Sequence, residues 1–133
     1  MIERDHGSAY FHPDSAAARD AIECQVALQR HAGGNALIGR ELYPLLSDAE
    51  FDDVKVSPCV AYVDGNRPQL ADGFTRKTFI AMVEGVREDA FDGGLISPER
   101  FDEGIADLRR TAEPDGVFCY MFFRGVARRS AFG

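Results

Sequence analysis

The stretch VFCYMFF, residues 117–123, decides the fold of this chain. All of its side chains are apolar or aromatic, so it lacks the alternation of apolar and polar residues that is typical of a half-exposed strand. A continuous apolar strand is normally covered on both faces and lies inside a sheet. The sequence therefore predicts a central β-strand here, introduced by the turn EPDG at residues 113–116.

A second strand is predicted earlier in the chain, at residues 51–63. Apolar and polar side chains alternate from Phe51 to Val56, and β-favouring residues continue to Val63. Pro58 lies inside this run and has no N–H group to donate to a neighbouring strand. We therefore expect this strand to lie at an edge of the sheet or to be broken in two.

Helices are predicted before this strand. Asp14 or Ser15 can cap a helix over residues 15–32, which Gly33 and the glycine after it would end. Pro44 cannot lie inside a regular helix, so the next segment should form a turn from Ile38 to Leu42 and a helix from about Tyr43.

Two more helices are predicted between the strands. Residues 69–90 show apolar residues at helical spacing, and Ser97 followed by Pro98 is a helix-start signal. These two patterns predict a helical hairpin, at about residues 69–112, inserted between the two strands. The resulting order of helices and strands is that of an α/β fold, and the 133 residues, 45% of them hydrophobic, should form a single domain over residues 1–133.

The composition argues against several classes of partner. A net charge of −7 disfavours nucleic acid, whose phosphates require a basic surface. The charged first residues and the absence of a run of about 20 apolar residues argue against a signal peptide and a membrane span, so a cytoplasmic location is expected. Cys24, Cys59 and Cys119 are expected to be buried free thiols. No metal site is predicted, because the carboxylates at residues 50–53 are typical of a solvated surface.

Several segments together resemble one enzyme family. They are ERDHG at residues 3–7, GNALIGREL at 34–42, LLSDAEFDDVKV at 45–56, LISPERF at 95–101, and residues 118–129. In this order they are similar to the C-terminal half of class I, Rossmann-like methyltransferases of the UbiE-like small-molecule type, which use S-adenosylmethionine. The resemblance implies a remnant of the family's fifth strand at residues 1–3, with the seventh strand lying between the fifth and the sixth. Glu50 stands where such proteins usually have a helix-ending glycine.

The resemblance does not extend to the cofactor site. Such enzymes hold S-adenosylmethionine with a glycine-rich loop after the first strand, whereas the glycine pairs here follow predicted helices. We therefore expect the chain alone to bind no cofactor and to be inactive in methyl transfer. The expected explanations are a truncated reading frame, a cut chain, or a partner that supplies the N-terminal half.

The resemblance also implies a substrate pocket. It would be formed by the loop after the fifth strand and by the inserted helix, and its candidate residues are Glu3, Asp5, His6, Tyr10, Phe11, His12, Phe74, Thr78, Phe79 and Met82. His6 and His12 are weak candidates for the catalytic base, because a histidine near neutral pKa can accept a proton from a hydroxyl or amine. The alternatives are that both histidines lie in an exposed loop and that the aromatic residues simply pack in the core.

A second hypothesis is a noncatalytic association module. If the first strand is cut to residues 1–3, the strand from Val117 to Ala127 has an unpaired apolar edge, which favours pairing with another chain. This predicts a homodimer joined at that strand, with the missing N-terminal half as the alternative partner.

Overall fold

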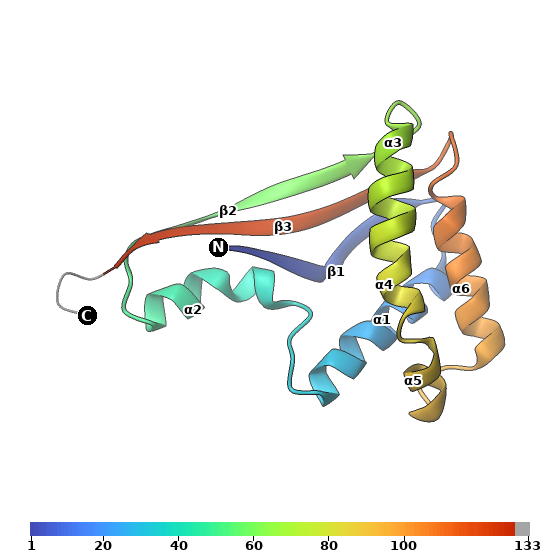
Figure 1. The fold of residues 1–133 in the computed structure, drawn as a ribbon, viewed down its shortest axis with the longest axis horizontal. Coiled ribbons are helices and arrows are strands. Elements are labelled where there is room, and N and C mark those ends of the chain that lie inside the picture. Colours follow the sequence, from blue (N-terminus) through green and yellow to red (C-terminus); the bar gives the residue numbers. More distant parts are fainter. Residues whose placement is uncertain (130–133) are drawn as a thin grey trace.

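The computed structural model describes residues 1–129, and these residues form an α/β protein (Figure 1). Its strands are β1 (Ile2–His12), β2 (Asp52–Val63) and β3 (Val117–Arg128). Its helices are α1 (Ala16–His31), the 3-10 helix η1 (Ile38–Glu41), α2 (Leu42–Asp48), α3 (Pro68–Leu70), the π-helix η2 (Ala71–Ile80), α4 (Ala81–Glu84), α5 (Arg87–Asp92) and α6 (Pro98–Arg110). In this part of the chain, no helix has both the length and the apolar character needed to cross a membrane.

The predicted central strand is confirmed. The sheet has the order β1-β3-β2, and β3 is antiparallel to both neighbours. Phe118, for example, pairs with Phe11 on one side and with Val63 on the other. The expected remnant of a first strand is wrong, because β1 is a full strand of 11 residues. The unpaired edge predicted for residues 117–127 is therefore wrong as well, since β1 occupies it.

The second strand lies at an edge, as Pro58 predicts. Among residues 1–129, β3 is the one strand that pairs with β2, and Pro58 stands opposite Phe123 within one continuous strand of 12 residues. The missing N–H group of Pro58 is thus tolerated because β2 has a free outer side. The break predicted as the alternative does not occur.

The helices before β2 follow their capping signals. Ser15 caps α1 by accepting a hydrogen bond of 3.0 Å from the Ala18 N–H, and Gly33 takes a φ of +84° beyond the helix. The segment around Pro44 divides into η1 and α2, as expected. Glu50 adopts a φ of +64° after α2, so a residue other than glycine takes the left-handed position there.

The inserted helices differ in detail from the prediction. The predicted helix at 69–90 is continuous only from α3 through α4, and most of it is the π-helix η2. It ends at Gly85, and α5 then forms a separate short helix before Gly94 takes a φ of +66°. α6 begins as predicted, with Ser97 accepting a hydrogen bond from the Arg100 N–H and Pro98 in the first helical position.

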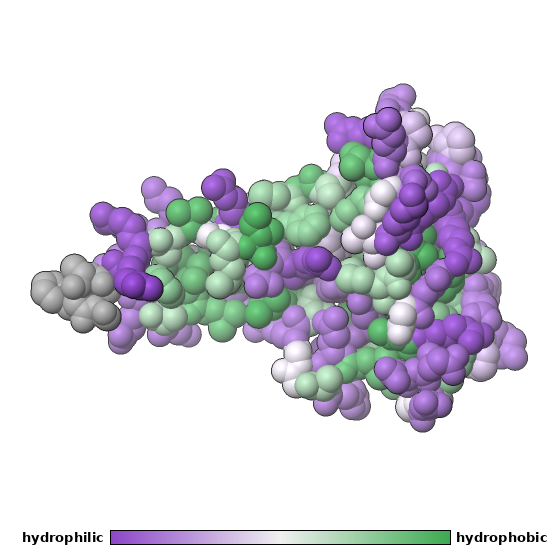
Figure 2. Space-filling view, viewed as in Figure 1, coloured by the Kyte–Doolittle hydropathy of each residue, from purple (hydrophilic) through white to green (hydrophobic). Residues whose placement is uncertain are grey.

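The molecule has two visibly different ends (Figure 1). At the helical end, α1, η2, α4 and α6 pack on one another and on the sheet, and this end holds the hydrophobic core. The sheet arm consists of residues 2–4, 52–58 and 123–128 of the three strands, with α2 packed against it near Gly125. Figure 2 shows hydrophobic side chains on the surface along this arm.

The cysteine prediction holds only in part. The structure contains no disulfide among Cys24, Cys59 and Cys119. Cys24 is buried in α1 and Cys119 is half-buried, but Cys59 is exposed. Cys59 is exposed on β2, which is an edge strand and is exposed over most of its length.

Candidate functional site

The π-helix η2 turns a set of large side chains toward the sheet. In a π-helix the hydrogen bonds run from residue i to i+5, so residues five apart lie on the same face. Phe74 and Phe79 have this spacing, and both contact the aromatic side chains of β3. Runs of π-helix are rare and occur often at functional sites. The face of this helix that lies against β3 is therefore a candidate binding region.

A small apolar pocket lies between this helix and β3. Its volume is about 50 Å³, and its lining residues are Arg4, Phe74, Thr78, Phe79, Met82, Tyr120 and Phe122. The Phe74 ring centroid lies 5.9 Å from that of Tyr120 and 6.1 Å from that of Phe122, both in tilted arrangements. Edge and tilted contacts of this kind are the favoured arrangements of aromatic rings. All four residues predicted from the inserted helix line this pocket, and their role in substrate binding stays a prediction.

Arg4 supplies the charge at the pocket. It lies on β1 directly opposite Phe122 of β3, and its Nη1 atom is 3.1 Å from the Met82 sulfur. Among residues 1–129, no carboxylate lies within ion-pair distance of Arg4. A thioether is a weak acceptor, so the guanidinium keeps most of its hydrogen-bonding capacity.

Two buried polar side chains lie beside the pocket. His6 and Tyr120 are 5% and 1% exposed, and their ring centroids are 5.8 Å apart in an edge-to-face contact. The His6 ring also stacks on Phe79. His6 Nδ1 and the Tyr120 hydroxyl have no hydrogen-bond partner among the described residues. Buried polar groups normally have partners, so a ligand atom that supplied one would gain a strong hydrogen bond here.

Burial sets the protonation of both groups. Burial lowers the pKa of His6, and the nearby charge of Arg4 lowers it further. Burial raises the pKa of Tyr120 well above its usual range, and Arg4 only partly opposes this effect. At neutral pH the imidazole is therefore uncharged, and the phenol keeps its proton and can donate it in a hydrogen bond.

An irregular segment of β1 turns His6 inward. The register between β1 and β3 shifts between Asp5 and Tyr10, and the Ser8 hydroxyl bridges the gap by accepting a hydrogen bond of 3.0 Å from the Met121 N–H. The buried Asp5 carboxylate accepts two hydrogen bonds from Arg40, of 2.6 and 2.9 Å. The backbone N–H of His6 donates to the Ala36 carbonyl oxygen at 2.9 Å.

The predicted loop of substrate-binding residues is instead the strand β1. Its residues therefore point in different directions. Phe11 packs in the core against Phe118, whereas Tyr10 and His12 are exposed and do not line the pocket. Glu3 lines a different hollow, together with His6. The alternative that both histidines lie in an exposed loop is wrong for His6, which is buried.

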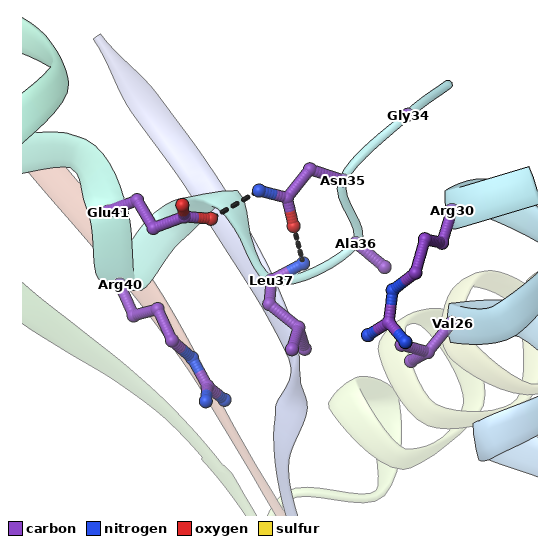
Figure 3. Close-up of a pocket in the computed structure, with 8 residues that line it drawn as sticks. All are labelled: Val26, Arg30, Gly34, Asn35, Ala36, Leu37, Arg40 and Glu41. Carbon is purple, nitrogen blue, oxygen red and sulfur yellow. Dashed lines mark hydrogen bonds between the residues drawn. The ribbon is translucent and has the colours of Figure 1, made fainter. Parts of the chain in front are cut away.

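A larger hollow lies between the end of α1 and η1 (Figure 3). Its volume is about 360 Å³, and Figure 3 shows Arg30 and Arg40 entering from opposite sides of Leu37. Several of its polar groups already have partners, since Asn35 bonds to Glu41 and to the Leu37 N–H, and Arg40 binds Asp5. We therefore regard the small aromatic pocket as the stronger candidate.

Sequence reasoning missed Arg4, Tyr120 and Phe122. A signal for the last two was present, because Phe118, Tyr120 and Phe122 alternate along β3 and so share one face of the sheet. Arg4 was hidden because its segment was interpreted as the end of a cut strand. Only the pairing of β1 with β3 shows that Arg4 stands opposite Phe122.

The expectation that this chain alone binds no S-adenosylmethionine stays a prediction, and the positions of its glycines bear on it. Within residues 1–129, Gly33 and Gly94 follow helices. Gly65 follows β2, but a Cβ atom there would lie 2.0 Å from Pro114 O, so the backbone already fills that space. A cofactor loop needs a glycine turn whose backbone is open to the ligand.

Comparison with models of known protein families gives no match, and comparison with curated proteins identifies no related sequence. The family resemblance of the sequence segments stays a prediction.

Proposed function

We propose that this chain is the substrate-side part of an S-adenosylmethionine-dependent methyltransferase that acts on a small molecule. The chain by itself, in this proposal, does not transfer methyl groups, because its residues do not fit the cofactor. The pocket between η2 and β3 would hold the methyl acceptor.

The strand order is the observation that carries this proposal. The outer strands β1 and β2 are each antiparallel to β3, so they run parallel to one another on either side of it. The family that the sequence resembles has the same arrangement for its fifth, seventh and sixth strands. A sheet grown only from hairpins would place β2 next to β1, and that neighbouring pair is missing here.

The pocket is consistent with a small acceptor. Methyl transfer requires mainly that the acceptor atom be held in line with the methyl group, and at most one base. Packed aromatic rings supply such positioning, and His6 is uncharged at neutral pH and lies against Phe79. On β1, His6 lies two residues after Arg4, which lines the pocket.

The first test uses the chain itself. We expect isothermal titration calorimetry to show no binding of S-adenosylmethionine or of its demethylated product to residues 1–133. Tight binding of either compound would contradict the claim that this chain is inactive for lack of a cofactor site.

The second test uses the DNA upstream of the first codon. If the reading frame continues through a strand and a glycine-rich loop, the longer protein should bind S-adenosylmethionine and transfer its radiolabelled methyl group to a small molecule. Thr78→Trp, which fills the pocket, should abolish transfer and leave cofactor binding intact. Lys77→Trp, on the exposed face of the same helix, is the matched control. A longer protein that is indifferent to Thr78→Trp would contradict the assignment of the pocket.

Association with a second copy of the chain is the other candidate function. The proposed contact is a face of the sheet and not the edge of residues 117–127, which β1 occupies. Tyr10, Cys119 and Tyr62 pair across the three strands and therefore share one face. Tyr10 is 65% exposed and Val60 is 58% exposed, which is unusual for large apolar side chains grouped on a sheet. Multi-angle light scattering should then show a dimer that Tyr62→Lys dissociates, whereas a monomer at micromolar concentration would exclude this function.

A further inference from the structure

We propose that the pocket between η2 and β3 takes the edge of a small aromatic carboxylate, with the carboxylate on Arg4 and the Tyr120 hydroxyl donating to the ligand. This inference names the substrate class of the proposed methyltransferase and in that sense rests on the proposed function. The binding itself needs neither cofactor nor methyl transfer.

The sign of the charge comes from Arg4. The buried carboxylate next to it in the sequence, Asp5, is already held by two hydrogen bonds from Arg40. Within residues 1–129, the one hydrogen-bond partner of the Arg4 guanidinium is the weakly accepting Met82 sulfur, at 3.1 Å. A ligand carboxylate would replace this contact with a charge-assisted hydrogen bond, which is about twice as strong as a neutral one. Clusters of aromatic rings also attract cations, but an arginine at the mouth repels them.

The aromatic part of the ligand follows from the shape and lining of the pocket. Phe74, Tyr120 and Phe122 present their rings at centroid distances of 5.2 to 6.1 Å. An engineered cavity of about 150 Å³ holds a whole benzene molecule. This pocket, at about 50 Å³, accepts only the edge of a ring, and the flexible Met82 at its mouth can move to cover the remainder.

The hydrogen-bond donor is the Tyr120 hydroxyl. Its side chain lines the pocket, is 1% exposed and has no partner for its hydroxyl among the described residues. Because burial raises its pKa, the hydroxyl is a neutral donor at neutral pH. Thr78, the other hydroxyl of the lining, already donates to Gly73 O at 2.8 Å. A ligand oxygen is therefore the partner that completes the site.

The test uses benzoate as the probe and follows the NMR signals of the chain. We expect saturable shifts at Phe74, Tyr120 and Phe122 with a dissociation constant of about 1 mM or lower, as befits so small a ligand. Benzylammonium, which has a similar ring and the opposite charge, should bind at least about tenfold more weakly. Equal binding of the two compounds, or no shift with benzoate, would overturn the proposal.

Two variants and one control locate the contact. Arg4→Met should weaken benzoate binding at least about tenfold, whereas Arg124→Met, an exposed arginine on β3 outside the pocket, should leave it unchanged. Tyr120→Phe keeps the ring and removes a hydroxyl that has no partner, so it should fold and bind benzoate several-fold more weakly. If Arg4→Met and Arg124→Met have the same effect, the proposal is wrong.

The failure of this inference and that of the proposed function are distinguishable. If benzoate binds at Arg4 but the longer protein transfers no methyl group, the proposed function fails and the aromatic-acid site stands. If the longer protein methylates other molecules and the chain ignores benzoate, the methyltransferase assignment stands and the substrate class is wrong.

Discussion

The helical end and the sheet arm are stabilised in different ways. At the helical end, Phe79, Phe101, Phe118 and Leu108 are at most 1% exposed, and α1 and α6 pack so closely that Gly104 touches the Ala17 carbonyl. Along the arm, β2 is mostly exposed, and the short helices η1 and α2 pack against the sheet. The same sheet therefore changes from a buried core layer to a partly bare surface along its length. The candidate pocket lies at the boundary between the core part of the sheet and the arm, since its lining includes Arg4 of the arm and Phe79 of the core.

The largest expected effect is that of removing a core aromatic from the helical end. Phe79→Ala should lower the free energy of unfolding by about 3–5 kcal/mol, because it removes a fully buried ring that contacts Phe118 and Tyr120. Phe51→Ala, at the residue directly before the β2 part of the arm, where the ring is 39% exposed, should cost about 1 kcal/mol or less. Urea denaturation measures both. Equal losses would show that the two ends do not differ in packing.

A next test compares glycines in close contacts. In Gly104→Ala the new Cβ would lie 2.4 Å from the Ala17 carbonyl oxygen, so two helices must move apart at a cost of about 1–3 kcal/mol. In Gly125→Ala in the arm, the Cβ would meet side-chain atoms of Leu46 and Leu42, which can rotate away. We expect the melting temperature to fall clearly more for Gly104→Ala. The reverse order would contradict the difference in rigidity.

A smaller effect is expected at the ion pair that joins β1 to η1. Arg40→Met leaves the Asp5 carboxylate, 3% exposed, without its cation, and should destabilise the protein by about 1–2 kcal/mol because Arg40 itself is half-exposed. Arg128→Met removes an arginine from an exposed pair with Asp53 at the tip of the arm. Chemical denaturation should show no measurable change for it. The prediction fails if both variants behave alike.

The smallest effect is the dependence of stability on pH. Because burial lowers the pKa of His6, the unfolded chain binds a proton at a higher pH than the folded one does. The stability is therefore fully present above about pH 6.5 and declines as the pH falls from there through the lowered pKa. His6→Phe should remove this decline, which thermal melts at a series of pH values would detect. His12→Gln, on an exposed side chain, should leave it unchanged.

Much of the candidate site was predictable, but its assembly was not. The family resemblance implied that Phe74, Thr78, Phe79 and Met82 of the inserted helix lie at one site, and they do line one pocket. The sequence pattern did not distinguish an α-helix from the π-helix η2, because the two differ by one residue in hydrogen-bond spacing. It also could not place Arg4, which reaches the pocket only through pairing with a strand more than a hundred residues away.

The sequence by itself determined the local elements and their positions within the sheet. The apolar run at 117–123 specified a central strand, Pro58 limited its segment to an edge strand or a broken one, and the capping residues at 14–15 and Ser97 specified the starts of α1 and α6. These are properties of short segments, set by backbone hydrogen bonding and capping. Tertiary structure decided that residues 2–12 are a strand and not a loop, since only β3 supplies the partner that an extended segment needs. For the same reason it decided that Arg4 and Tyr120 meet at one pocket and that His6 lies beside it, because long-range strand pairing leaves no trace in the residues nearby.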